Sequence, residues 1–106
     1  MCHIIDIKGK YKIEVYNHDL KGIYFWNQAK SFAQDLGQGW RLPTAEEIKE
    51  LYKNKEMLNF ANYGFWAYWT SEEIGHDGCC YNGPNGEIYT TNKESEFYVR
   101  LVRDIE

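Results

Sequence analysis

The stretch that decides the fold is Gly39-Trp40-Arg41-Leu42-Pro43-Thr44-Ala45-Glu46-Glu47, residues 39–47. Thr44 is of the type that caps helices, and Glu47, three positions later, can reach back to close a capping box. Pro43 prevents a preceding helix from continuing into this point. The stretch therefore predicts a helix with a defined first residue. Just before it, a tryptophan and an arginine are held at a fixed place.

Helical periodicity on both sides of residues 39–47 predicts two helices. The first is expected over residues 25–36, where apolar residues recur on one stripe with polar residues largely opposite, and Gly37 is suited to end it. The stripe consists of Phe25, Ala29, Phe32, Ala33 and Leu36. The second helix is expected over residues 45–53. Its apolar face consists of Ile48, Leu51 and Tyr52. We expect both helices to pack on the same sheet.

Strand-like segments are expected near both ends of the chain. Residues 4–7 and 11–16 flank Lys8-Gly9-Lys10 and predict an N-terminal hairpin. Residues 65–71 are rich in aromatic side chains and apolar on both faces up to Trp69, as in a central strand. Further strands are expected at residues 79–82, 87–90 and 97–102, the last with alternate residues on one face. The whole chain, residues 1–106, is predicted to be one α+β domain. Its two helices pack on a twisted antiparallel sheet that carries a long loop region.

Composition and charge argue against several classes of partner. The chain has 106 residues, a formal net charge of −4 and no block of lysine or arginine, so binding to nucleic acid phosphates is not expected. No apolar run approaches the ~20 residues that a membrane span needs, and no signal peptide opens the chain. We expect a soluble protein that is made in the cytoplasm, with the host cytoplasm or a phage virion as places where it acts.

Three groups of residues stand in a recognisable order. Trp26-Asn27-Gln28-Ala29 starts the first helix, residues 39–44 join it to the second, and residues 68–71 and 99–103 supply late strands. This order resembles the Lcl C-terminal-like domain family, also met as the Fibrobacter major paralogous domain. That family in turn resembles a branch of the C-type-lectin-like fold. Formylglycine-generating-enzyme domains and the variable proteins of diversity-generating retroelements are other branches of the same fold.

The resemblance covers about residues 24–104 and leaves the N-terminal hairpin, residues 1–16, outside it. A terminal strand that pairs with the last strand would suit the fold. The resemblance implies structural roles for six residues, which are Trp26, Trp40, Leu42, Trp69, Arg100 and Arg103. The residue pattern agrees, because it predicts that Trp40 and Trp69 lie in the core. Trp40→Ala is therefore expected to lower the free energy of unfolding by about 3–5 kcal/mol. Arg41, between two apolar residues, is expected to pair with a carboxylate.

A group of cysteine and histidine residues raises a chemical alternative. His76, Cys79 and Cys80 lie close in sequence, and Cys2-His3 could approach them to complete a zinc site. Neighbouring Cys79 and Cys80 point to opposite faces of a strand, so they cannot easily share one metal ion. The resemblance also raises an oxidase that uses a cysteine pair. We expect no catalysis, metal or cofactor, and the alternative is a metal-dependent or thiol-based enzyme using Cys79, Cys80 and His76.

The loop-rich region supplies the candidate binding surface. Tyrosine and asparagine are typical of adaptable contact surfaces, and six residues within 66–92 are expected to gather on one face. They are Trp66, Tyr81, Asn82, Asn85, Tyr89 and Asn92. The resemblance to retroelement variable proteins, in which this general face binds ligands, implies a non-catalytic module that binds a protein partner. The expected roles are bacterial or phage adhesion, receptor binding, a virion accessory or inhibition of a host protein. Assembly as a homo-oligomer stays open.

Overall fold

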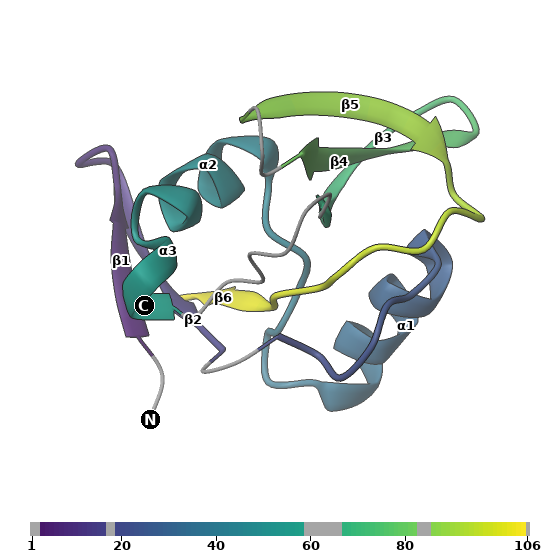
Figure 1. The fold of residues 1–106 in the computed structure, drawn as a ribbon. Helices are drawn as coiled ribbons and strands as arrows, with labels where there is room; N and C mark the ends of the chain where they lie inside the picture. The colour runs from purple at the N-terminus through teal and green to yellow at the C-terminus, as the bar shows by residue number, and fades with distance from the viewer. Residues whose placement is uncertain (1–2, 17–18, 59–66, 83–85, 106) are drawn as a thin grey trace.

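The computed structural model describes residues 3–16, 19–58, 67–82 and 86–105 of the chain (Figure 1). The described strands form two antiparallel three-stranded sheets, with strand orders β1-β2-β6 and β3-β4-β5. The elements are β1 (His3–Ile7), β2 (Tyr11–Val15), α1 (Trp26–Leu36), α2 (Ala45–Lys53), α3 (Lys55–Leu58), β3 (Ala67–Ile74), β4 (Asp77–Asn82), β5 (Glu87–Asn92) and β6 (Val102–Asp104). The α+β class is confirmed, but two small sheets replace the single twisted sheet that the sequence predicts.

The first sheet contains the predicted N-terminal hairpin and lies at the left in Figure 1. β1 pairs with β2, with Ile5 opposite Ile13, and β2 pairs with β6, with Val15 opposite Val102. The N-terminal segment therefore does pair with the last strand. Ile5, Ile13 and Val15 are buried because alternate residues of a strand share one face.

The second sheet lies between α1 and α2 and separates two hydrophobic clusters. Tyr68 of β3 and Tyr81 of β4 belong to the cluster that also contains Ile48 and Leu51 of α2. The opposite cluster combines α1 with the same two strands, through Trp26, Ala29, Ala33, Ala67, Trp69 and Cys80. Successive strand residues point to opposite faces, so β3 and β4 serve both clusters. Both helices pack on the same sheet, as expected, but they cover opposite faces of it.

β3, which the sequence predicts as a central strand, stands at one edge of its sheet, and β4 is central. The outer edge of β3 is nevertheless covered by the chain around Tyr98. The backbone N–H of Trp69 donates to the carbonyl of Tyr98 at 3.1 Å, and the N–H of Tyr98 donates to the carbonyl of Ala67 at 3.0 Å. β3 is therefore hydrogen-bonded on both sides over its first half. Tyr68 and Trp69 point in opposite directions, and both are fully buried because a hydrophobic cluster covers each face of the sheet.

The buried face of α1 differs from the predicted stripe. Trp26, Ala29 and Ala33 are buried, whereas Phe25, Phe32 and Leu36, the three large members of the predicted stripe, are exposed. The two sets are about a fifth of a turn apart around the helix axis. The indole N–H of Trp26 donates to the carbonyl of Thr70 at 2.9 Å, which holds the buried set against β3. Gly37 ends the helix with a positive φ of 70°, as expected.

The last predicted strand, residues 97–102, is also corrected by the structure, because β6 covers only Val102–Asp104. Residues 97–101 run as an extended segment between β3 and the chain that precedes α1. The backbone N–H of Leu20 donates to the carbonyl of Val99, and that of Tyr16 donates to the carbonyl of Leu101, both at 2.9 Å. Val99, Arg100 and Leu101 are all buried, so the expected alternation of buried and exposed residues does not occur.

Gly78 of β4 lies under two indole rings, so we predict that a methyl group here destabilises the fold. A Cβ atom at this position would lie 2.8 Å from Cδ1 of Trp26 and 3.0 Å from Cζ3 of Trp69. Gly78→Ala should therefore lower the free energy of unfolding by about 1–3 kcal/mol, as overpacking does elsewhere. Urea denaturation measures this. The loss should shrink when Trp26 is also changed to Leu, and an equal loss in both backgrounds would contradict the predicted clash.

Candidate functional site

Glu47 is the centre of a buried ionic network that begins in the stretch 39–47. It is 1% exposed and accepts two hydrogen bonds from the Arg41 guanidinium, at 2.7 and 2.9 Å. The Tyr11 hydroxyl donates to it at 2.6 Å and the backbone N–H of Thr44 at 2.9 Å, which closes the predicted capping box. Arg41 also donates to Asp104 at 2.8 Å. The expected carboxylate partner of Arg41 is thus the same residue that caps α2.

The protonation states in this network suit a structural role. Burial by itself raises the pKa of Glu47, but the hydrogen bonds from Arg41, Tyr11 and Thr44 outweigh it and leave the pKa below its ordinary value of 4.5. Burial and the hydrogen bond to Glu47 raise the pKa of Tyr11 to about 12. At neutral pH the carboxylate is charged and the phenol is protonated. Four donors engage the carboxylate, so it is poorly placed to act as a general base.

Arg100 forms a second buried network and is fully enclosed. Its Nε donates to Asp19 at 2.8 Å, and its Nη2 donates to the carbonyl of Leu58 at the end of α3. Asp19 also accepts from the Tyr68 hydroxyl. The network ties α3, β3 and the segment before α1 to the C-terminal segment. Arg103 pairs with Glu14 at 2.7 Å. These contacts confirm the structural roles that the resemblance implies for both arginines.

Among the residues that the structure describes, Cys79, Cys80 and His76 do not form an exposed reactive group, and Cys2 of the predicted zinc group lies outside that part of the chain. Cys79 and Cys80 are both buried, and His76 lies in the exposed turn between β3 and β4. Burial raises the pKa of the Cys80 thiol to about 11, and burial followed by the charge of Glu72 raises that of Cys79. A high pKa disfavours the thiolate, which is the reactive form. Within the described ranges, no group of three or more His, Cys, Asp or Glu residues could hold a metal ion.

The predicted binding face of residues 66–92 is only partly visible. Trp66 and Asn85 lie outside the described residues. Tyr81 is buried against Tyr52, with ring centroids 5.4 Å apart, and Asn82 is also buried.

Tyr89 and Asn92 are exposed on β5. They are three positions apart, so they point to opposite sides of the strand. The members that are described therefore do not gather on one face.

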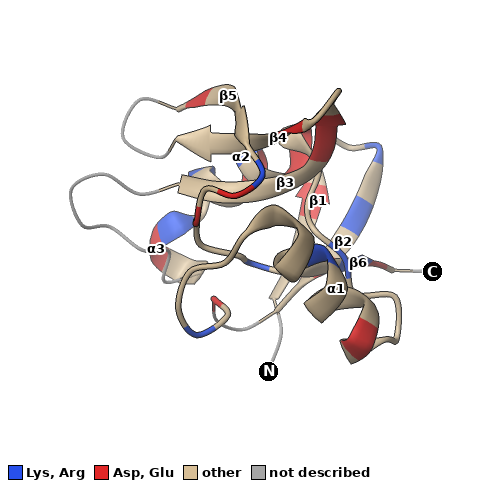
Figure 2. Ribbon diagram, turned by 90° about the vertical axis from the view of Figure 1, so that its right-hand side faces the viewer, with Lys and Arg blue, Asp and Glu red and all other residues tan. Residues whose placement is uncertain are grey.

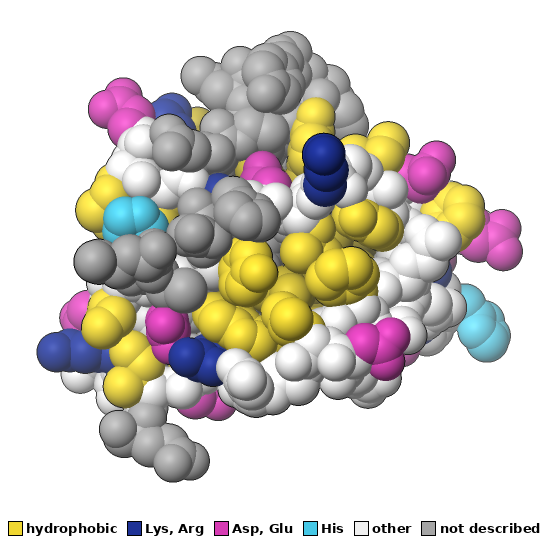
Figure 3. Space-filling model, turned by 90° about the horizontal axis from the view of Figure 1, so that it is seen from below, with side chains coloured by type: hydrophobic (Ala, Val, Ile, Leu, Met, Phe, Trp, Pro, Cys, Tyr) yellow, Lys and Arg dark blue, Asp and Glu magenta, His cyan; other side chains and the backbone are white. Residues whose placement is uncertain are grey.

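An exposed apolar surface that sequence analysis missed lies on α1 and the residues just before it. We name it the α1 patch, and it consists of Ile23, Phe25, Phe32 and Leu36, each between 36% and 47% exposed. The ring of Tyr24 lies beside that of Phe32, with centroids 6.2 Å apart. Figure 1 places α1 low in the molecule, and the view from below in Figure 3 shows hydrophobic side chains gathered in one patch on this side. The spacing of residues 25, 32 and 36 on one helical stripe is the signal for this surface in the sequence, although the sequence predicts that α1 packs on the sheet through that stripe.

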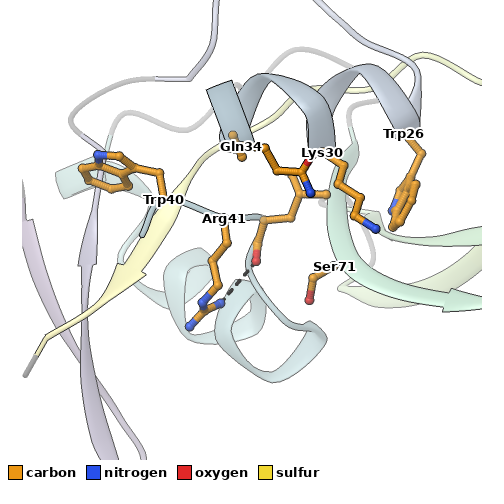
Figure 4. Close-up of a pocket in the computed structure, with 8 residues that line it drawn as sticks. Trp26, Lys30, Gln34, Trp40, Arg41 and Ser71 are labelled. Atoms are coloured by element: carbon orange, nitrogen blue, oxygen red, sulfur yellow. Dashed lines mark hydrogen bonds between the residues drawn. The ribbon is translucent and has the colours of Figure 1, made fainter. Parts of the chain in front are cut away.

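The other flank of α1 borders a small pocket of about 160 Å³ (Figure 4). It is lined by Trp26, Lys30, Ala33, Gln34, Trp40, Arg41, Leu42 and Ser71. The linker between α1 and α2, residues 37–44, is held in place here by backbone hydrogen bonds. Arg41 exchanges two with Val102, and the N–H of Ser71 donates to the carbonyl of Pro43 at 2.8 Å. The fold-deciding stretch thus forms one wall of a cavity as well as the start of α2.

Comparison with known proteins supports the resemblance. A family model described as the Lcl C-terminal domain matches residues 7–103. This match begins earlier than residues 24–104 and takes in β2 of the N-terminal hairpin. No curated protein sequence matches the chain. Every helix in the described ranges is too short or too polar to span a lipid bilayer.

Proposed function

The chain belongs to the Lcl C-terminal domain family, and on that premise we propose that it is a C-type-lectin-like module that binds a protein partner and catalyses no reaction. The pairing of β2 with β6 supports the C-type-lectin-like assignment, because a terminal strand beside the last strand suits that fold. The buried ionic networks support a binding role, because they place the enclosed charges of Glu47 and Arg100 in structural contacts.

The observation that carries the proposal is the α1 patch. Its four large apolar side chains are exposed, whereas the buried residues of α1 are Trp26, Ala29 and Ala33. Each of them is 36–47% exposed, so covering the rest of one such side chain is worth about 0.5–1.5 kcal/mol, and a partner that covers all four would gain appreciable affinity. Contiguous exposed apolar surface with a polar border is typical of protein interaction sites.

The surroundings of the α1 patch have the mixed character of a protein interface. A shallow hollow on α1 combines Tyr24 and Phe32 with polar side chains, which are Asn27, Gln28, Ser31 and Asp35. In the part of the chain that the structure describes, lysine and arginine are interspersed with acidic residues (Figure 2). A nucleic acid or an anionic membrane would be favoured by a continuous basic surface, so a protein is the better partner.

The biological setting of the proposal follows the resemblance. We propose adhesion, receptor binding, a virion accessory role or host inhibition, in bacteria or their phages. Tyr89 and Asn92, the exposed residues among the described members of the 66–92 set, stay proposed contact residues, one on each side of β5. The enzymatic alternative, through Cys79, Cys80 and His76, is less favoured because both thiols are buried and their pKa values are raised.

Partner capture with matched surface variants tests this function. The tagged protein is incubated with bacterial lysate, and bound proteins are identified by mass spectrometry. Phe32→Glu places a charge in the centre of the α1 patch and should abolish capture of a specific partner. Met57→Glu makes the same kind of change at an exposed apolar residue of α3 and should leave capture intact. Tyr89→Ala tests the 66–92 face, whereas a change at buried Tyr81 would test stability instead.

Equal capture by the wild type, Phe32→Glu and Met57→Glu would contradict the α1 patch as the binding surface. Light scattering of the purified protein covers the case in which the partner is a second copy. In that case the wild type should be an oligomer and Phe32→Glu a monomer.

A further inference from the structure

The pocket between α1 and the linker has an apolar floor that is already formed. Trp26, Ala33, Trp40 and Leu42 line it and are all buried. The indole of Trp40 is held edge-on by Tyr16, with centroids 5.1 Å apart, and is stacked by the Arg103 guanidinium at 4.5 Å. Small-molecule sites are typically concave and apolar, with a few polar groups that orient the ligand.

The polar groups of this pocket stand at its rim. Lys30 and Gln34 come from α1 and Ser71 comes from β3, and all three are exposed. Figure 4 shows the Lys30 side chain extending across the pocket towards Trp26, and its ammonium group lies 5.4 Å from the centroid of that ring. The fourth polar residue, Arg41, is already engaged by Glu47 and Asp104.

The charge of Lys30 is available to a ligand. Among the described residues, no carboxylate forms an ion pair with Lys30. The charge of Lys30 helps to lower the pKa of Glu73, but the ion-pair partner of Glu73 is Lys93. The other acid close to this rim, Glu72, accepts a hydrogen bond from the backbone N–H of Ala45 at 2.9 Å. An ammonium that has no ion-pair partner among the described residues and stands beside an apolar pocket favours an anionic ligand.

We propose that this pocket binds a small monocarboxylate that carries a single aromatic ring. The ring would lie on the floor between Trp26 and Trp40, and the carboxylate would meet Lys30 and the Ser71 hydroxyl at the rim. Apolar cavities of about 150 Å³ are large enough to hold benzene, so the volume fits one ring and is too small for a sugar chain or a nucleotide. This site lies on the opposite flank of α1 from the α1 patch and does not depend on the protein-binding function.

Phenylacetate is the probe for this site, and benzyl alcohol is the neutral control of similar size. Titrations are followed by NMR shifts of the indole N–H signals, assigned by single tryptophan substitutions. Phenylacetate should shift the Trp26 and Trp40 signals in a saturable way, and benzyl alcohol should bind at least about tenfold more weakly, the ratio that one charge-assisted hydrogen bond supplies. Lys30→Gln should weaken phenylacetate binding by about the same factor and leave benzyl alcohol unchanged.

Lys49→Gln is the matched control, because Lys49 is an exposed lysine of a different helix, α2. It should leave both affinities as in the wild type. Equal binding of phenylacetate and benzyl alcohol, or an unchanged phenylacetate affinity in Lys30→Gln, would overturn the carboxylate assignment. Shifts confined to other parts of the protein would overturn the site itself. If Lys30→Gln loses phenylacetate binding but still captures the protein partner, this site is separate from the protein-binding surface.

Discussion

Glu47→Gln should lower the free energy of unfolding by about 3 kcal/mol at neutral pH, the lower end of the cost of breaking a buried ion pair. The lower end applies because the Arg41 side chain is 31% exposed and keeps Asp104 as a partner. The amide still has an oxygen that can accept from Thr44, but it carries no charge to balance the guanidinium. Urea denaturation of the wild type and the variant gives the difference directly.

The same variant should change the acid dependence of stability. Folding lowers the pKa of Glu47 below 4.5, so its charged form favours the folded state. This contribution is fully present above pH 4.5 and is lost as the pH falls through the lower, folded-state value. The wild type should therefore lose more stability than Glu47→Gln between neutral pH and about pH 3.

Glu46→Gln provides the control, because Glu46 is the neighbouring residue in the same first turn of α2. It faces solvent and lies 3.4 Å from Lys8, a surface pair of the kind worth about 0–1 kcal/mol. Its substitution should leave both the neutral-pH stability and the acid response close to the wild type. If the two variants behave alike, the buried network does not hold α2 against β6.

Trp69→Ala should cost about 5 kcal/mol, the upper end for removal of a buried tryptophan. Its ring is fully buried, packs edge-on against Phe97 at 4.8 Å and donates to the carbonyl of Tyr24 at 2.7 Å. The substitution therefore leaves a cavity in the cluster beneath α1 and removes one of two donors to the Tyr24 carbonyl, which keeps the backbone N–H of Phe97 at 3.0 Å. Domains of this size have a net stability of about 5–15 kcal/mol, so the variant should be largely unfolded or close to it. Circular dichroism and urea denaturation measure this.

Two further variants separate the causes of that loss. Trp69→Phe retains an aromatic ring and removes the donor to Tyr24, so it should cost clearly less than Trp69→Ala. Trp40→Ala should cost about 3 kcal/mol, because that indole lines the pocket wall and its loss opens a smaller cavity. A loss of stability in Trp69→Ala no larger than that in Trp40→Ala would contradict the central role of Trp69 in the cluster beneath α1.

Local interactions were the part of this fold that sequence reasoning predicted well. The capping box of Thr44 and Glu47 and the N-terminal hairpin depend on residues close together in the chain, and their chemistry identifies them. The position of Arg41 between two apolar residues also predicts a carboxylate partner, and only the structure shows that Glu47, which caps α2, is that partner. The order of aromatic and arginine residues was specific enough to indicate the family.

Contacts between distant segments decided the rest, and a pattern within one segment does not contain them. The apolar stripe of α1 includes both Ala33 and Phe32, and only the neighbouring indole of Trp26, bound to Thr70 of β3, determines which one is buried. Tyrosine is a residue type typical of contact surfaces, yet Tyr81 is buried against α2. The pocket forms for the same reason, because backbone hydrogen bonds bring the linker to β6 and β3. Sequence alone thus determined the class and the local elements, whereas the tertiary structure chose the exposed surfaces, because burial depends on residues far away in the chain.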